Sequence, residues 1–131
     1  MVRPRSDHPT PAELEVLKIL WKQGPLSVRD VMRHLDGPPD RAYTTVMSLL
    51  GVMHDKGLLE RHSEGKAFIY AAAADEHGTL SVMLSDLVNR AFHGSSSALV
   101  AHLLEGENPS SEDLKEIRDL ISKYRRDKEL A

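Results

Sequence analysis

Apolar residues recur at helical spacing in a first segment that begins at Thr10-Pro11-Ala12-Glu13. This tetrad predicts a capped helix start, because Thr10 and Glu13 can form a capping box and proline is favoured at the first helical position. Gly24-Pro25 is expected to end the helix. Its apolar positions are Leu14, Leu17, Leu20 and Trp21.

Two further short helices are predicted before residue 58. Ser27-Val28-Arg29-Asp30 repeats the start signal, and Asp36-Gly37-Pro38-Pro39 stops the second helix. Asp40 is expected to cap the third helix, which ends at Lys56-Gly57. The expected apolar stripes are Val28, Val31, Met32 and Leu35 in the second helix, and Tyr43, Val46, Leu49, Leu50 and Met53 in the third.

A change of period marks a hairpin after the third helix. Two strand-like runs, residues 58–62 and 67–70, flank a turn predicted at Ser63-Glu64-Gly65-Lys66. Three short helices followed by a hairpin predict a winged helix-turn-helix, in which the third helix enters the DNA major groove. The fold class is therefore mainly α with a small β wing, and residues 1–73 form the predicted DNA-binding domain.

Residues 74–131 return to helical patterns and form a predicted dimerisation domain. Three amphipathic helices of this total length rarely bury enough core by themselves, so their apolar stripes are expected to pack against a second copy in a homodimer. The expected interface residues are Leu80, Leu84, Leu87, Leu99, Leu103, Leu114, Ile117, Ile121 and Tyr124.

The third helix has a small, polar outward face if its apolar stripe points inward. Hydroxyl groups bond phosphates or base edges, and an arginine can reach a phosphate or a guanine. An ordinary solvated helix face or a lone surface cation is the alternative at each position. The predicted DNA contacts are Arg41, Tyr43, Thr44, Thr45 and Ser48 on the helix, Arg61 and Lys66 on the hairpin, and Arg29 at the second helix.

The net charge of −3 among 131 residues argues against a nucleic-acid partner until the charges are located. Residues 1–73 hold ten basic and nine acidic side chains, whereas residues 74–131 hold seven and eleven. The acidic excess therefore lies in the predicted dimerisation domain, and DNA binding by the head remains compatible with the composition.

Neither a metal site nor catalytic chemistry is predicted. The chain has no cysteine, which excludes thiolate metal sites and cysteine nucleophiles. His102 and Glu105 could share a helix face, but scattered histidines without metal-ligand spacing are usually ordinary surface or interface residues. No phosphate-binding glycine loop, nucleophile elbow or persuasive carboxylate pair is present, so a non-enzyme without cofactors is expected. With no leader or membrane span recognised, the cytoplasm is the expected compartment.

Several of these motifs together resemble the BlaI/MecI/CopY family of penicillinase-type repressors. The resemblance rests on Pro11–Leu17 with Leu20-Trp21, Ser27–Val31, Ala42–Met47, Lys56–Leu59 and Phe68–Tyr70, and Ala42–Val46 followed by Lys56-Gly57 is its most specific part. Ser97–Val100 and Ser110–Leu114 are similar to the dimerisation helices of the family.

The resemblance implies a dimeric repressor with two winged-helix heads on a palindromic operator. It also implies release by an effector or by a sensor-linked protease that cuts between Asn and Phe after a Leu-Val pair. Here Leu99-Val100 is followed by Ala101-His102, so cleavage at this bond is not predicted, and the absence of cysteine excludes copper sensing through thiolates. Gly51-Val52 stands where family members commonly carry a polar or basic residue, so the resemblance does not predict the operator sequence that this chain binds. The alternative function is a winged-helix adaptor that binds proteins and not specific DNA.

Overall fold

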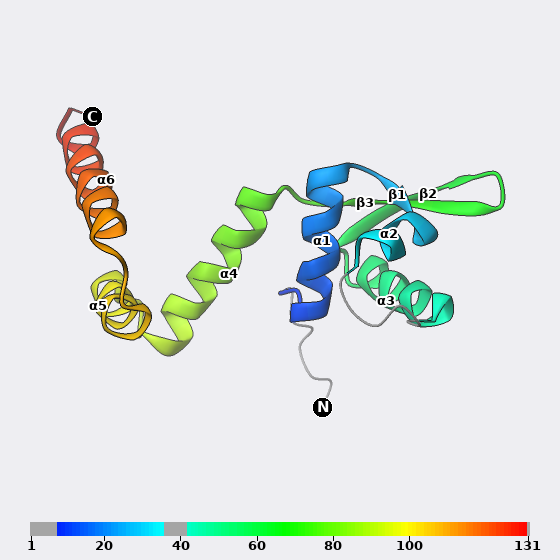
Figure 1. Ribbon diagram of the computed structural model, residues 1–131, viewed down its shortest axis with the longest axis horizontal. Helices are drawn as coiled ribbons and strands as arrows, with labels where there is room; N and C mark the ends of the chain where they lie inside the picture. The colour runs from blue at the N-terminus through cyan, green and yellow to red at the C-terminus, as the bar shows by residue number, and fades with distance from the viewer. Residues whose placement is uncertain (1–7, 36–41, 131) are drawn as a thin grey trace. The chain divides into compact units, whose positions relative to one another are not determined.

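The computed structural model describes residues 8–35 and 42–130, which form six helices and three strands (Figure 1). The chain divides into two compact units, Met1–Ser85 and Asp86–Ala131. In chain order the elements are α1 (Pro11–Gln23), β1 (Leu26–Ser27), α2 (Val28–His34), α3 (Tyr43–Asp55), β2 (Leu59–Glu64), β3 (Ala67–Ala72), α4 (Glu76–Ala91), α5 (Ser96–Glu107) and α6 (Ser111–Leu130).

The predicted start of the first helix is confirmed. The Thr10 hydroxyl accepts a hydrogen bond from the Glu13 N–H at 3.2 Å, and the Glu13 carboxylate accepts one from the Thr10 N–H at 2.9 Å. Gly24, with a φ of 86°, ends α1 in a conformation that favours glycine. Ser27 likewise caps α2 by accepting from the Asp30 N–H.

The hairpin belongs to a three-stranded antiparallel sheet of order β1-β3-β2. Strand β2 continues to Glu64, so the turn is shorter than predicted and consists of Gly65 and Lys66. Gly65 has a φ of 64°, as the first central residue of a tight II′ hairpin turn requires. Strand β1 was not predicted; it pairs Leu26 with Tyr70 and Ser27 with Ile69 on the other edge of β3.

One hydrophobic core joins the three helices of the head to the sheet. In the described part of the chain, the buried hydrophobic side chains are Val16, Leu17, Leu20, Val28, Val31, Val46, Leu50, Met53, Leu59 and Tyr70. Each large side chain contributes about 1.5–3 kcal/mol by leaving water. Since this set ends at Tyr70, the head is the part of the chain that buries its own apolar surface.

A buried ion pair connects the start of α1 with the end of α3. Lys56 Nζ lies 2.7 Å from Glu13 Oε1, the same oxygen that accepts the Thr10 N–H. The Glu13 side chain is 3% exposed and that of Lys56 is 18% exposed. Burial by itself raises the pKa of Glu13, but the hydrogen bonds from Lys56 and Thr10 and the positive charge of Lys56 together hold it below its ordinary value of 4.5.

The start of α3 differs from the sequence prediction. Ala42 is the N-cap and makes no side-chain capping bond, so the helix begins at Tyr43. Asp40 and Arg41 lie outside the described residues. Tyr43 was also expected in the buried stripe, but its side chain is 40% exposed, because it occupies the first turn, beyond the core contacts of Val46 and Leu50.

Each of the three C-terminal helices begins at a side chain that accepts a hydrogen bond from a backbone N–H of the first turn. Asp75 accepts from the Gly78 N–H at the start of α4, Ser95 from the Ala98 N–H at α5, and Ser110 from the Asp113 N–H at α6. Gly106 lies inside α5, and the left-handed Asn108 (φ 47°) ends that helix. None of these three helices has a buried residue among those described.

Replacing Glu13 with glutamine tests the ion pair. Glutamine keeps the capping oxygen but loses the charge, so the variant should unfold with a free energy about 1–3 kcal/mol lower at pH 7. Because the folded-state pKa of Glu13 is lowered, its contribution is fully present above about pH 4.5 and is lost as the pH falls through the folded value. The variant should therefore lose less stability than the wild type on acidification.

Urea unfolding at pH 7 and below pH 4.5, followed by the fluorescence of the single tryptophan, measures both effects. Glu112→Gln, at an exposed first-turn glutamate of α6, is the matched control. Identical unfolding midpoints for Glu13→Gln and wild type at both pH values would show that the pair does not stabilise the head.

Candidate nucleic-acid interface

Helix α3 presents an uncharged outward face. Val46, Leu50 and Met53 point into the core. The opposite side carries Thr44, Ser48 and Val52, which follow one another at intervals of four residues and are all exposed. Thr45 is exposed beside this line. The structure thus places the three predicted hydroxyl residues of α3 on its solvent side.

The side chain of Arg29 connects the two helices of the helix-turn-helix. It stands at the second position of α2, and its guanidinium carbon lies 5.2 Å from the centre of the Tyr43 ring. A cation at this distance over an aromatic face is attracted by the ring electrons. The exposed Tyr43 ring therefore holds a predicted cation next to the outward face of α3.

The β2–β3 hairpin separates its charges between its two faces. Cross-strand partners share a face, so Arg61 and Ser63 lie on the same side as Tyr70 and Phe68. This is also the face of the buried Leu59 and Tyr70, and therefore the one that turns toward the helices. The acidic side chains Glu60 and Glu64 lie with His62 on the opposite face.

Arg61 is held on the exposed ring of Phe68. Its guanidinium carbon lies 4.3 Å from the ring centre, and Phe68 is 43% exposed. Lys66 is exposed in the turn at the end of the hairpin, which projects beyond the helices of the head (Figure 1). The hairpin thus carries its cations on the helix-facing side and at its tip.

Sequence reasoning missed three contributors to this surface. Phe68 was expected only as a strand residue, and its pairing with Arg61 depends on the register across the hairpin. Met47 of α3 is 43% exposed and Val52 is 51% exposed, yet neither was among the predicted contacts. In the sequence, Met47 and Val52 are apolar residues that lie outside the helical stripe of Val46, Leu50 and Met53, and that position is the signal that identifies them.

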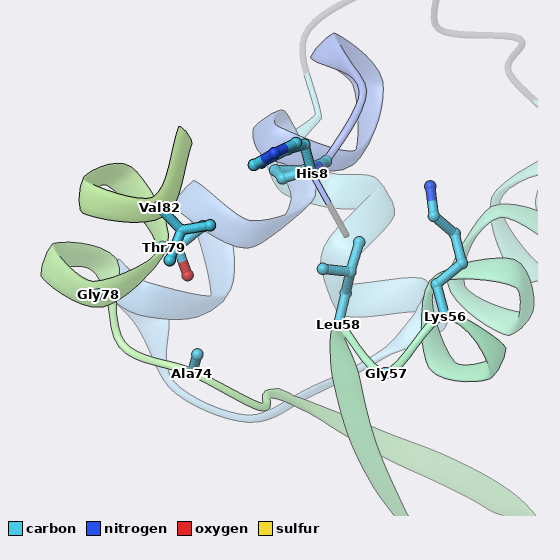
Figure 2. A pocket seen from close by; sticks show the side chains of 9 residues that line it. His8, Lys56, Gly57, Leu58, Ala74, Gly78, Thr79 and Val82 are labelled. Atoms are coloured by element: carbon cyan, nitrogen blue, oxygen red, sulfur yellow. The ribbon is translucent and has the colours of Figure 1, made fainter. Parts of the chain in front are cut away.

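A pocket of about 390 Å³ lies behind α3, within the first unit. Figure 2 shows Lys56, Gly57 and Leu58 on one side of it, and Gly78, Thr79 and Val82 from the first turns of α4 on the other. The charge of Lys56 is compensated by Glu13. None of the predicted cations Arg29, Arg61 and Lys66 lines this pocket.

The predicted dimerisation residues are exposed or half-buried. Leu99 and Ile117 are half-buried. The others are Leu80 at 39% exposure, Leu84 at 52%, Leu87 at 47%, Leu103 at 45%, Leu114 at 45%, Ile121 at 52% and Tyr124 at 68%. His102 packs edge-to-face against Phe92, with ring centres 5.6 Å apart.

The described part of the chain offers neither a metal cluster nor a membrane-spanning helix. Across residues 8–35 and 42–130, no three histidine, aspartate or glutamate side chains gather as a metal site requires. Within the same ranges, no helix combines the length and the apolar composition needed to cross a membrane.

Three helices around one core and a β-hairpin beside the third helix define a winged-helix fold of the kind found in transcription regulators. The pattern of the penicillinase repressor family matches residues 9–123. The chain therefore belongs to this family and is a transcriptional repressor of the BlaI/MecI type, not an enzyme.

Two relatives and one solved structure are similar to this chain in sequence. The penicillinase repressor of Bacillus licheniformis is 28% identical over 114 residues, which cover 87% of this chain and 89% of the relative. The methicillin resistance regulatory protein MecI of Staphylococcus aureus is 24% identical over 112 residues, which cover 86% and 91%. The solution structure of the DNA-binding domain of the repressor BlaI is 30% identical and covers 56% of this chain and 90% of that chain, with a TM-score of 0.47.

Replacing Gly51 with alanine tests whether the missing side chain at this position allows the backbone of α3 to approach DNA closely. A Cβ at this position would meet nothing within 4 Å, so the head can accept it. Alanine in a helix interior is more favourable than glycine by about 0.5–1 kcal/mol, so the variant should be more stable by that amount. Its DNA affinity should fall, because the added methyl group keeps the helix backbone further from the duplex.

Thermal unfolding and fluorescence anisotropy with labelled DNA measure the two effects. Gly106→Ala is the matched control, since its Cβ would also meet nothing within 4 Å and it lies in α5. A Gly51→Ala variant that is more stable and binds DNA as tightly as wild type would show that α3 does not approach DNA at this position.

Proposed function

We propose that the chain represses transcription as a homodimer on a palindromic operator, with α3 of each head in the major groove. One observation carries the proposal: the exposed, uncharged face of α3 is accompanied by cations from α2 and from the hairpin. Small polar and apolar side chains can approach base edges closely, and the flanking cations can bind the phosphates on either side.

The three described cations have distinct proposed roles. Arg29, held on Tyr43, binds a phosphate beside the groove that α3 enters. Arg61 and Lys66 bind the backbone of the neighbouring groove from the hairpin. A guanidinium lying on an aromatic ring still has N–H groups free at its edge, and it loses little side-chain freedom when it meets a phosphate. Arg41, just before α3, is proposed as a fourth contact.

The distribution of charge in the head determines how strongly it binds non-specific DNA. The head carries nearly equal numbers of basic and acidic residues, so few phosphates are neutralised and affinity for non-specific DNA is modest. Specificity then depends on the contacts of α3 and on the fixed spacing of two heads. A repressor of this kind acts where the chromosome is, in the bacterial cytoplasm.

We propose that the C-terminal helices form the dimer, with residues 74–131 as the dimerisation domain. The helices α4, α5 and α6 contain no buried residue among those described, although each carries a stripe of leucine, isoleucine or valine. Apolar surface of this extent needs a partner, and a second copy offers the same complementary stripe.

Release from the operator is proposed to come from an effector or from a sensor-linked protease. The Ala101–His102 bond lies inside α5, where every residue has helical backbone geometry, and His102 packs on Phe92. A protease that cut there would first have to open the helix. We therefore propose that this bond is not the point of release.

Selection of bound fragments from the source genome distinguishes the repressor from a protein-binding adaptor. The full chain is incubated with sheared genomic DNA, and the retained fragments are sequenced. A palindromic consensus with half-sites one helical turn or a multiple apart, at about 10–10.5 base pairs per turn, is expected. Retention of fragments without any shared sequence would contradict the proposal.

On the selected operator, the two kinds of contact should respond differently to alanine substitution. Lys66→Ala removes a phosphate contact, so binding should weaken similarly on operator and random DNA, with a shallower dependence on salt. Thr44→Ala removes a base-edge contact, so the loss should be about fivefold or more on the operator and small on random DNA.

Anisotropy titrations at several salt concentrations separate these effects. Lys18→Ala, an exposed cation on α1, is the control for Lys66. Equal operator affinity of Lys66→Ala, Thr44→Ala and wild type would rule out this docking arrangement.

The dimer proposal predicts a mass of twice 14.6 kDa in sedimentation equilibrium. Ile121→Glu places a charge in the proposed interface and should raise the dimer dissociation constant at least tenfold, because an unpaired charge is costly to bury. Leu130→Glu, at an 87% exposed leucine outside the proposed set, should leave it unchanged. A wild-type chain that sediments as a monomer at all concentrations would contradict the proposal, provided that circular dichroism shows a folded chain.

A further inference from the structure

Helix α3 lacks the side chains that usually distinguish bases by paired hydrogen bonds. From Tyr43 to Met53 it contains no arginine, lysine, asparagine or glutamine. Those four types form the common bidentate contacts with guanine and adenine. If α3 enters the major groove, as proposed above, it must therefore distinguish base pairs by other means.

Two apolar side chains occupy the solvent side of α3. Met47 is 43% exposed and Val52 is 51% exposed, whereas Val46, Leu50 and Met53 of the same helix are at most 1% exposed. The core is thus complete without Met47 and Val52. They flank the line of Thr44 and Ser48, one on each side of it.

The spacing of these two residues fits two separate base pairs. Five positions along an α-helix correspond to a rise of about 7.5 Å. Successive base pairs are about 3.4 Å apart along each strand. Met47 and Val52 are therefore about two base-pair steps apart along the helix axis. Gly51 lies between them and leaves the backbone uncovered, since a Cβ there would meet nothing within 4 Å.

The major groove offers one apolar group, the C5-methyl group of thymine. An exposed methionine or valine gains most by contacting that group, because both surfaces then leave water. Contact with the polar edge of a G·C pair would instead remove hydrogen-bonding groups from water without replacement. The flexible, polarisable methionine can adjust to the position of the methyl group.

We propose that Met47 and Val52 determine operator specificity by contacting the methyl groups of two thymines in each half-site. This inference rests on the proposed function, because it requires α3 in the major groove. It assigns base recognition to apolar contacts, in addition to the hydroxyl groups of Thr44 and Ser48.

Replacing thymine by uracil tests this contact directly, because uracil lacks only the C5-methyl group and keeps every hydrogen-bonding atom. Each thymine of one half-site in the selected operator duplex is replaced singly by deoxyuridine. The dissociation constant of the full-length chain is then measured by anisotropy. At two positions the replacement should weaken wild-type binding about fourfold, the effect expected for losing one buried methyl group.

Alanine variants assign each methyl group to its side chain. Met47→Ala should bind the thymine operator more weakly and should no longer respond to uracil at one of the two positions, while still responding at the other. Val52→Ala should show the converse. Val82→Ala, at a valine of α4 with 55% exposure, should respond to uracil at both positions as wild type does.

The outcomes separate this inference from the proposed function. Specific binding that is unaffected by uracil at every position would overturn the methyl contact and leave the operator function standing. A uracil penalty that persists in both alanine variants would overturn the assignment to Met47 and Val52. Failure of the wild-type chain to select any DNA sequence would overturn the proposed function and this inference with it.

Discussion

One carboxylate oxygen of Glu13 connects the beginning of α1 to the end of α3, and this contact joins two of the three helices of the head. The oxygen accepts from the Thr10 N–H and from Lys56 Nζ, so the capping of one helix and the C-terminal end of another share a group. Removing one partner of a buried ion pair is costly, because the other charge is then buried without compensation. Here the two partners come from opposite parts of the head, the first turn of α1 and the end of α3. Apolar packing through Val46, Leu50 and Met53 fixes which side of α3 faces outward.

The head and the C-terminal helices differ in how much of their apolar surface is buried. In the described residues, the head buries or half-buries its large apolar side chains, and the exposed ones are Tyr43, Met47, Val52 and Phe68. The C-terminal helices instead leave their stripes exposed, as a segment that folds against a second copy would. Charge is also distributed unequally between the two parts, because the acidic excess that gives the net charge of −3 lies in residues 74–131. The net charge of the whole chain does not show that, in the hairpin of the head, Arg61 lies on the helix-facing side and Glu60 and Glu64 lie on the opposite face.

Short-range sequence signals predicted much of this structure. The features that they missed depend on contacts between residues far apart in the sequence. The caps at Thr10 and Ser27 and the winged-helix order follow from short-range chemistry, and each is confirmed. Strand β1 has two residues and is stabilised by pairing with β3, so no periodicity marks it. Glu13 and Lys56 were each explained by a helix terminus, whereas their ion pair joins residues 43 positions apart. Tyr43 fits the helical stripe but lies beyond the core, which periodicity alone cannot show. The roles of the DNA-facing and dimerisation residues remain predictions.

The central claim is that α3 and the hairpin together form the DNA-binding surface. Amide chemical shifts of the full-length chain, recorded by NMR while the operator duplex is added, locate that surface residue by residue. The account predicts the largest changes at the N–H groups of α3 from Tyr43 to Val52 and at the hairpin from Arg61 to Phe68. Changes in α6 should be small. Changes confined to the C-terminal helices, with α3 unaffected at saturating DNA, would contradict it.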